Sequence, residues 1–239
     1  MRLKDKVAII TGTAGGMGEA SALLFAAEGA KVACVDLTEE RTAHVVEKIR
    51  AAGGEAIAIG ADVTRFADAE RIAARTIAEL GVPNILFNNA GADTENKQSI
   101  LNIDEAAFDR VVEVNLKGPW LMIKAVAPHM IENGGGSIIN TTSISSYIAA
   151  SSAGYSASKA GLAALTRIAA VLPEGGVFGV LLAYSVLAVL GLGLGAWSDD
   201  ARERFSLLRA SCERMDLLME HGALGVWDWE EGGSIRLEG

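Results

Sequence analysis

Tyr155 and Lys159 have residue types and a spacing that suit proton transfer. A separation of four residues places both side chains on one face of a helix. A phenol with a pKa of about 10 is a poor base at neutral pH, and a nearby ammonium group lowers that pKa by stabilising the phenolate. The pair therefore predicts a proton-transfer unit. Tyr-x-x-x-Lys also arises by chance on solvated helices, but Ser143 stands twelve residues upstream, at the end of an apolar run.

A glycine-rich stretch near the N-terminus, TGTAGGMG, follows an apolar run and opens a helical pattern. Gly12 permits a tight turn, and Gly16 lets the backbone approach a pyrophosphate. Gly18 lets the helix pack closely on the strand, and the helix N-terminus faces the negative charge. Because a strand, a loop, a helix and a second strand follow one another here, the stretch predicts a dinucleotide-binding turn rather than an ordinary connection.

Asp36 ends the second apolar run, where a carboxylate can accept hydrogen bonds from both ribose hydroxyls of an adenosine. Its charge would repel a 2′-phosphate, and no arginine occupies the neighbouring positions Thr13 or Leu37. We therefore expect NAD rather than NADP as the cofactor. A helix-capping or turn carboxylate is the alternative interpretation of Asp36.

The elements that must position these residues alternate along the first 170 positions. Apolar runs at 6–11, 31–36, 55–62, 84–91 and 136–143 are separated by segments with apolar residues at three- and four-residue intervals. Strands that are apolar throughout are buried on both faces of a sheet. The pattern predicts an α/β fold with a doubly wound parallel sheet and helices on both faces.

Composition narrows the classes of partner. The net charge of −9 argues against a nucleic-acid partner, which requires a basic face. Cys34 and Cys212 form no disulfide framework, and the N-terminus lacks a signal-peptide pattern, so we expect a reducing, cytoplasmic location. The three histidines are scattered without acidic or cysteine neighbours, and no metal site is expected.

Five motifs occur in the order and approximate spacing of the short-chain dehydrogenase/reductase family: TGTAGGMG, the NNAG of residues 88–91, Asn115 in VNLKG, Ser143, and YSASK. Residues 1–170 resemble that family, which implies a Rossmann domain carrying the catalytic Tyr/Lys helix. The resemblance implies that Tyr155 is the acid/base and that Lys159 lowers its pKa and binds the nicotinamide ribose. It further implies that Ser143 positions the substrate oxygen, with Thr142 as the weaker candidate, and that Asn115 holds a water linking Lys159 to solvent.

The same resemblance implies which residues bind the cofactor. Asp62 and Val63 are expected to meet the adenine, and Asn88 to Gly91 to lie beside the adenosine ribose and the central sheet. The expected cofactor-binding residues are Gly12, Thr13, Gly16, Met17, Gly18, Asp36, Leu37, Asp62, Val63, Asn89, Ala90, Gly91, Tyr155 and Lys159.

The resemblance implies hydride transfer between nicotinamide and a secondary alcohol or ketone, by an enzyme that forms a homo-oligomer. An alternative is a nucleotide-binding protein that retains the fold with impaired or no turnover. A third possibility is a membrane-tethered signalling fragment with the Rossmann part as its cytosolic module.

Residues 171–239 depart from the family pattern, because no Pro-Gly and no recognisable substrate loop follow the Tyr/Lys helix. GGVFGVLLAYS is interpreted either as a divergent sixth strand or as part of a membrane helix. The 21 uncharged residues from Val177 to Trp197 are long enough to span a bilayer. A third interpretation is a junction with unrelated sequence near 171–175, and the tail weakly resembles the opening of a PAS sensor domain. A membrane partner is expected only if 177–197 is a true span.

Overall fold

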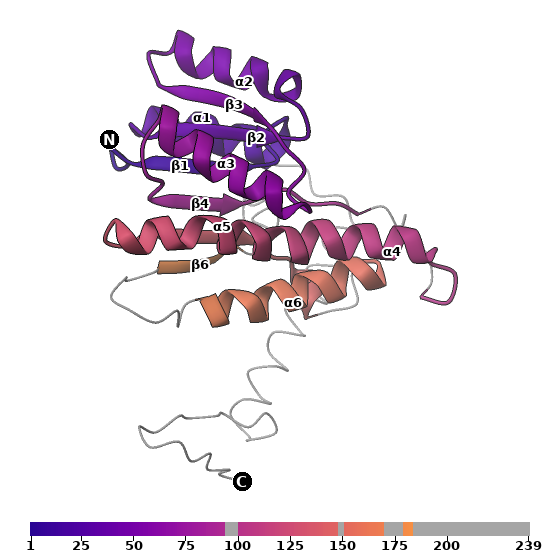
Figure 1. Cartoon of the computed structure of the whole chain (residues 1–239). Helices are drawn as coiled ribbons and strands as arrows, with labels where there is room; N and C mark the ends of the chain where they lie inside the picture. Colours follow the sequence, from indigo (N-terminus) through magenta and orange to yellow (C-terminus); the bar gives the residue numbers. More distant parts are fainter. Residues whose placement is uncertain (94–99, 148–150, 170–178, 184–239) are drawn as a thin grey trace, which may run out of the picture. The chain divides into compact units, whose positions relative to one another are not determined.

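The computed structural model describes residues 1–93, 100–147, 151–169 and 179–183. These residues form a sheet with helices on both faces (Figure 1). The strands are β1 (Val7–Thr11), β2 (Lys31–Asp36), β3 (Ala56–Gly60), β4 (Ile85–Asn88), β5 (Ser137–Thr141) and β6 (Gly179–Ala183). The helices are α1 (Gly16–Ala27), α2 (Glu39–Ala51), α3 (Phe66–Glu79), α4 (Glu105–Val112), α5 (Gly118–Glu132) and α6 (Ala153–Ala169), with a π-helical turn η1 (Glu113–Lys117) and a 3-10 turn η2 (Ile144–Ser146).

The sheet is parallel and its strand order is β3-β2-β1-β4-β5-β6. β1 lies at the centre, with β2 and β4 as its two neighbours, so the chain winds outward from β1 in both directions. In such sheets, ligands bind in the crevice beyond the carboxyl ends of the strands where the winding reverses. Here that crevice lies beyond the ends of β1 and β4.

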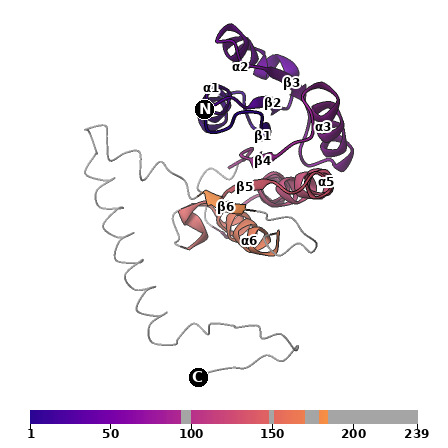
Figure 2. The ribbon, with the colours of Figure 1, turned by 90° about the vertical axis from the view of Figure 1, so that its left-hand side faces the viewer.

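Successive residues of the central strands face opposite sides of the sheet. Ile9 belongs to a core cluster shared with residues of α3 and α5, whereas Ile10 belongs to one shared with residues of α1 and α2. Figure 2 shows α3, α5 and α6 on one side of the sheet and α1 on the other. This two-sided burial explains why the strands are apolar throughout rather than alternating.

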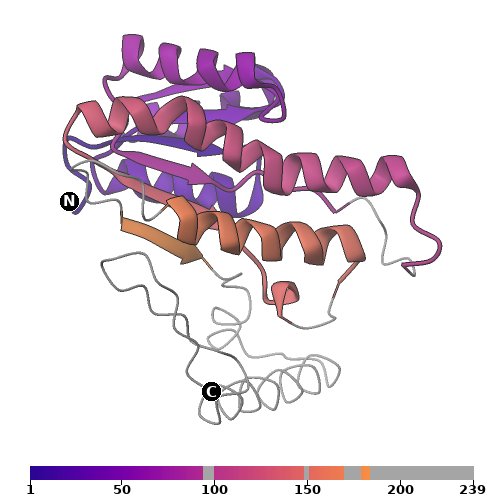
Figure 3. The same ribbon diagram turned by 60° about the horizontal axis from the view of Figure 1, so that its bottom comes forward.

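The predicted doubly wound parallel sheet is confirmed, and β1 to β5 each fall inside one of the five apolar runs. The segment with two interpretations also contributes to the sheet. Gly179–Ala183 form β6 and pair in parallel with β5, as a divergent sixth strand would, beside α6 (Figure 3).

The rest of the atypical segment, 171–178 and 184–239, lies outside the described residues. Contacts divide the chain into Met1–Ser185 and Val186–Gly239, and only the first unit contains described residues. The predicted junction, PAS-like tail and most of the predicted span fall in the undescribed part. Among the helices that the structure does describe, none is both long and apolar enough to cross a bilayer.

Candidate active site

A cavity of about 700 Å³ opens at the carboxyl ends of the strands. Its volume is in the range of small-molecule and cofactor sites. Eleven predicted residues line it: Gly12, Met17, Asp36, Leu37, Asp62, Val63, Asn89, Ala90, Gly91, Tyr155 and Lys159. The predicted residues outside its lining are Thr13, Gly16, Gly18, Asn115 and Ser143.

The glycines of the loop after β1 divide into two pairs. A Cβ built on Gly18 would lie 2.0 Å from the carbonyl oxygen of Gly12, and one built on Gly12 would lie 2.8 Å from the Cα of Ala90. At Gly15 and Gly16, by contrast, a Cβ would meet no atom within 4 Å. The first pair lets the loop and α1 pack closely on the sheet, as the spacing predicts. The second pair leaves open space before the N-terminus of α1, which suits a diphosphate.

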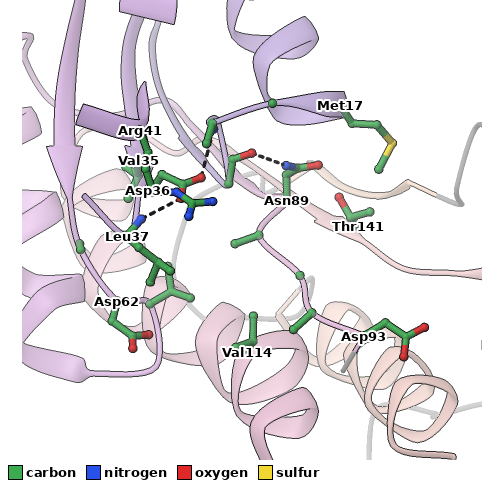
Figure 4. Close-up of a pocket in the computed structure, with 18 of the residues that line it drawn as sticks. Met17, Val35, Asp36, Leu37, Arg41, Asp62, Asn89, Asp93, Val114 and Thr141 are labelled. Carbon is green, nitrogen blue, oxygen red and sulfur yellow. Dashed lines mark hydrogen bonds and ion pairs between the residues drawn. The ribbon is translucent and has the colours of Figure 1, made fainter. Parts of the chain in front are cut away.

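Asp36 is largely engaged by protein groups. Its Oδ1 accepts a hydrogen bond from the Leu37 amide at 2.9 Å, and its Oδ2 accepts one from the Ala14 amide at 3.1 Å. Arg41 Nε also lies 2.7 Å from Asp36 Oδ1, although 55% of the Arg41 side chain is exposed (Figure 4). The sequence prediction considered arginines only at positions 13 and 37. Arg41 reaches Asp36 from the first turn of α2. The start of a helix soon after Asp36 was the sequence signal that could have indicated this ion pair.

Asp62 lies apart from Asp36 in the same cavity (Figure 4). It accepts hydrogen bonds from the amide and hydroxyl of Thr64, and Arg110 Nη1 lies 3.6 Å from its Oδ2. Although burial opposes ionisation, the Thr64 hydrogen bonds and the Arg110 charge together lower the pKa of Asp62. Arg110 belongs to α4, and no local pattern links it to Asp62 in the sequence.

The NNAG segment connects the loop after β1 to the loop after β4. The amides of Asn89 and Ala90 donate to Thr11 Oγ1 at 3.1 and 3.0 Å, and Asn89 Nδ2 donates to the carbonyl oxygens of Thr11 and Gly12. Asn88 instead points into the sheet, where it donates to Asn140 Oδ1 at 2.9 Å. The segment thus fixes the floor of the cavity.

Asn115 is fully buried and lies in the π-helical turn η1 rather than in a regular helix. Its Oδ1 accepts a hydrogen bond from the Ala92 amide at 2.8 Å. Its Nδ2 donates to the Ala92 carbonyl at 2.8 Å and to Ser158 Oγ at 3.2 Å. Both N–H groups of the amide are therefore used by protein, and only Oδ1 keeps a free lone pair for the predicted water. Single π turns often mark functional sites.

Lys159 is buried, with 3% of its surface exposed, and its Nζ donates to the Thr141 carbonyl at 2.7 Å. Burial lowers the pKa of Lys159 to about 8, because the charged form loses hydration. The Nζ lies 5.7 Å from the centroid of the Tyr155 ring. The helical spacing therefore brings the two side chains together, as predicted.

The predicted lowering of the Tyr155 pKa does not hold in this structure. Burial raises the pKa of Tyr155, a hydrogen bond with Ser143 opposes that rise, and the negative charge of Asp93 adds to it. The prediction considered only the ammonium group of Lys159, whereas burial of the phenol is the largest cause of the shift in the Tyr155 pKa. Tyr155 thus retains its proton at neutral pH here.

Ser143 lies just behind the cavity wall and is 5% exposed. Besides its hydrogen bond with Tyr155, its Oγ accepts one from the Ser145 amide at 3.2 Å, which caps η2. Thr142, the weaker candidate, is also buried and does not line the cavity. The contact with Tyr155 favours Ser143 over Thr142.

Asp93 was missed by sequence reasoning and lines the same cavity as Tyr155. Its carboxylate accepts hydrogen bonds from Ser151 Oγ at 3.3 Å and from Ser152 Oγ at 3.0 Å, immediately before α6. No motif marks Asp93, which simply follows NNAG by two residues. The other residues of the lining that were not predicted are Ala14, Gly15, Val35, Arg41, Ala61, Ala92, Arg110, Val114 and Thr141.

A doubly wound parallel sheet with a glycine loop before α1 and a carboxylate at the end of β2 defines a Rossmann-type dinucleotide-binding protein. A family model described as short chain dehydrogenase matches residues 6–174. The chain therefore belongs to the short-chain dehydrogenase/reductase family, whose fold binds a nicotinamide dinucleotide. No group of three or more potential metal ligands occurs among the described residues.

Individual relatives agree with this membership. An uncharacterized oxidoreductase of Thermotoga maritima is 41% identical over 172 residues, which are 72% of this chain and 67% of the relative. Secoisolariciresinol dehydrogenase of Forsythia intermedia is 40% identical over 75% of this chain and 64% of its own length. A short-chain type dehydrogenase/reductase from Mycobacterium marinum has a similar structure, with a TM-score of 0.68, 34% identity, and coverage of 71% and 69% of the two chains. The matched part thus spans about two thirds of these relatives, and the chain is classed with them as an oxidoreductase.

Proposed function

We propose that the protein is an NAD-dependent dehydrogenase that transfers a hydride between nicotinamide and a secondary alcohol or ketone. The observation that carries the proposal is the juxtaposition of Tyr155, Lys159 and Ser143 beside one cavity whose other end holds the glycine loop and Asp36. The names of the relatives favour this function over nucleotide binding without turnover.

The residues present fit a dinucleotide. The open space at Gly15 and Gly16 accepts the diphosphate, Asp36 accepts the ribose hydroxyls, and Asp62 and Val63 border the adenine region. A nicotinamide, when bound, supplies the hydride acceptor or donor at its ring. The protein supplies orientation and the path for the proton.

In alcohol oxidation, the hydride leaves the carbinol carbon while the hydroxyl proton passes to the phenolate of Tyr155, leaving a ketone and a neutral phenol. In ketone reduction, Tyr155 donates that proton to the carbonyl oxygen as the hydride arrives. Because burial raises the pKa of Tyr155, its neutral form predominates at neutral pH and suits reduction. Ser143 donates to or accepts from the same substrate oxygen, and Lys159 holds the nicotinamide ribose.

Asp36 supports NAD as the preferred cofactor, since its carboxylate repels a 2′-phosphate. We also propose that residues 1–170 form the catalytic domain, with the family match extending to residue 174. A homo-oligomeric state and a cytoplasmic location remain predictions from the sequence.

The test is the change in nicotinamide absorbance with a panel of secondary alcohols and ketones, with NAD and NADP compared at equal concentration. Turnover with NAD that exceeds turnover with NADP is the expected result. NADH binding without turnover on any compound would instead favour the nucleotide-binding alternative. Sedimentation would separately determine the oligomeric state.

A further inference from the structure

The charged groups that line the cavity differ in how they are neutralised. Asp36 faces Arg41 and Asp62 faces Arg110. Asp93 instead accepts hydrogen bonds from two serine hydroxyls, and no described residue forms an ion pair with it. Its negative charge is therefore the one carboxylate charge in the described lining that lacks a cationic partner.

Asp93 lies at the Tyr155 end of the cavity. It is exposed, it borders the same space as Tyr155, and its partner Ser152 precedes Tyr155 by three residues. Figure 4 shows Asp93 well apart from Asp36 and Asp62. A dinucleotide that extends from Asp36 toward Lys159 would leave Asp93 on the substrate side of the reacting atoms.

The opposing charge at this end is less accessible. Lys159 donates to the Thr141 carbonyl and is almost fully buried. Its Nζ also lies 3.8 Å from where a Cβ on Gly91 would stand and 5.7 Å from the Tyr155 ring centroid. A substrate at Tyr155 would therefore meet the exposed Asp93 carboxylate more directly than the Lys159 ammonium.

We propose that Asp93 is a specificity-determining residue that selects secondary alcohols carrying an ammonium or hydroxyl group next to the carbinol carbon and disfavours those carrying a carboxylate. The two serine hydroxyls hold the carboxylate in place, so an ammonium or hydroxyl of the substrate completes its hydrogen bonds. A substrate carboxylate would face a like charge there. This inference rests on the proposed function, because it assumes that alcohols bind beside Tyr155.

The test uses three secondary alcohols that differ in one substituent: 1-amino-2-propanol, 1,2-propanediol and lactate. Wild type is expected to show the highest kcat/KM for the ammonium compound and the lowest for lactate, with a ratio of about tenfold or more between them. Asp93→Asn keeps the size of the side chain and removes its charge. It should reduce the ratio about tenfold while NADH binding stays within about twofold.

Asp5→Asn is the matched control. Asp5 precedes β1, at the end of the sheet opposite the cavity, and is exposed, so this variant changes the net charge equally. It should leave the ratio unchanged. If Asp93→Asn fails to bind NADH, Asp93→Ser provides a second uncharged variant. The ratio of kcat/KM for 1-amino-2-propanol to that for lactate in the wild type is itself a test, because it does not depend on any variant.

A second readout separates the inference from the proposed function. The dissociation constants of the three compounds for the NADH complex follow from the fluorescence of bound NADH. The predicted charge order in binding, without turnover, would support the inference and overturn the proposed function. Turnover of the wild type with equal kcat/KM for all three compounds would overturn the inference alone, and failure of the wild type to bind NADH would overturn both.

Discussion

At the Asp36 end of the cavity the carboxylates have arginine partners, whereas at the Tyr155 end the charged groups are held by uncharged ones. Arg41 and Arg110 lie beside Asp36 and Asp62, but Lys159 donates to a backbone carbonyl and Asp93 accepts from serine hydroxyls. The ion pairs at the Asp36 end suit the binding of a ligand that carries its own charge. At the Tyr155 end, the charges of Lys159 and Asp93 have no ionic partner among the described residues, so their electric field acts on the groups that react there.

The largest effect is expected from Tyr155→Phe, which removes only the hydroxyl that carries the proton. Turnover should fall by about 10³-fold, because a positioned acid/base contributes that order of rate. NADH affinity should change little, since the phenol contributes no charge at neutral pH. Steady-state kinetics and NADH titration measure the two effects.

Tyr147→Phe is the control, since that side chain is 42% exposed and does not line the cavity. It should retain most of the activity. Equal activity of wild type and Tyr155→Phe would show that Tyr155 is not the acid/base.

Lys159→Met tests the cost of burying a charge at this end. Burial lowers the Lys159 pKa from 10.5 to about 8. Below pH 8 the lysine is protonated in both folded and unfolded states, so burial of the charged ammonium destabilises the folded state to the full extent. Between pH 8 and 10.5 the lysine loses its proton in the folded state but keeps it in the unfolded state, and this destabilisation is progressively removed.

The free energy of unfolding of the wild type should therefore rise by roughly 3 kcal/mol relative to Lys159→Met as pH increases through this range. Urea unfolding without cofactor at several pH values measures the difference. Lys4→Met, at an exposed position, should show no such trend. A difference that stays constant with pH would indicate that Lys159 is hydrated in solution.

The sequence predicted the glycine loop and the position of Asp36 better than the surroundings of Tyr155, for a physical reason. Glycine spacing and the end of β2 are local patterns, and the turn that they require follows from sterics within one βα unit. At the Tyr155 end, the pKa of Tyr155 depends on Ser143, Asp93 and burial, which come from separate segments. The periodicity of apolar residues predicted the five runs that contain β1 to β5. Whether the Tyr155 phenol is buried depends on the tertiary structure and cannot be read from a local pattern.

Pairs across the cavity were missed for the same reason. Arg110 reaches Asp62 from α4, and Asp93 reaches Ser152 across 59 positions of the chain. Arg41 is much closer in the sequence to its partner, five residues after Asp36. Its side chain reaches back because α2 begins at Glu39 and turns it toward the strand end.

At the Asp36 end, Asp36→Asn should weaken the preference for NAD. Asparagine keeps an acceptor oxygen for the ribose hydroxyls but removes the charge that repels a 2′-phosphate. The ratio of NADPH to NADH dissociation constants should fall by roughly thirtyfold, as expected for the loss of one like charge at close range. Fluorescence titration with both cofactors measures it. An unchanged ratio would mean that the 2′ position lies away from Asp36.

The smallest effect is expected from Arg41→Gln, which leaves Asp36 without its cation. Because Arg41 is 55% exposed, the ion pair contributes little to folding, and the variant should unfold at nearly the same urea concentration. Its guanidinium can still attract a 2′-phosphate, so its loss should weaken NADPH binding while Asp36 becomes freer for the ribose of NADH. The ratio of NADPH to NADH dissociation constants should rise by about fivefold, and more at low salt than at high salt. Arg2→Gln, at the exposed N-terminus, should leave the ratio unchanged. If this ratio instead falls in Arg41→Gln, Arg41 contributes to the binding of NADH and not to the binding of the 2′-phosphate of NADPH.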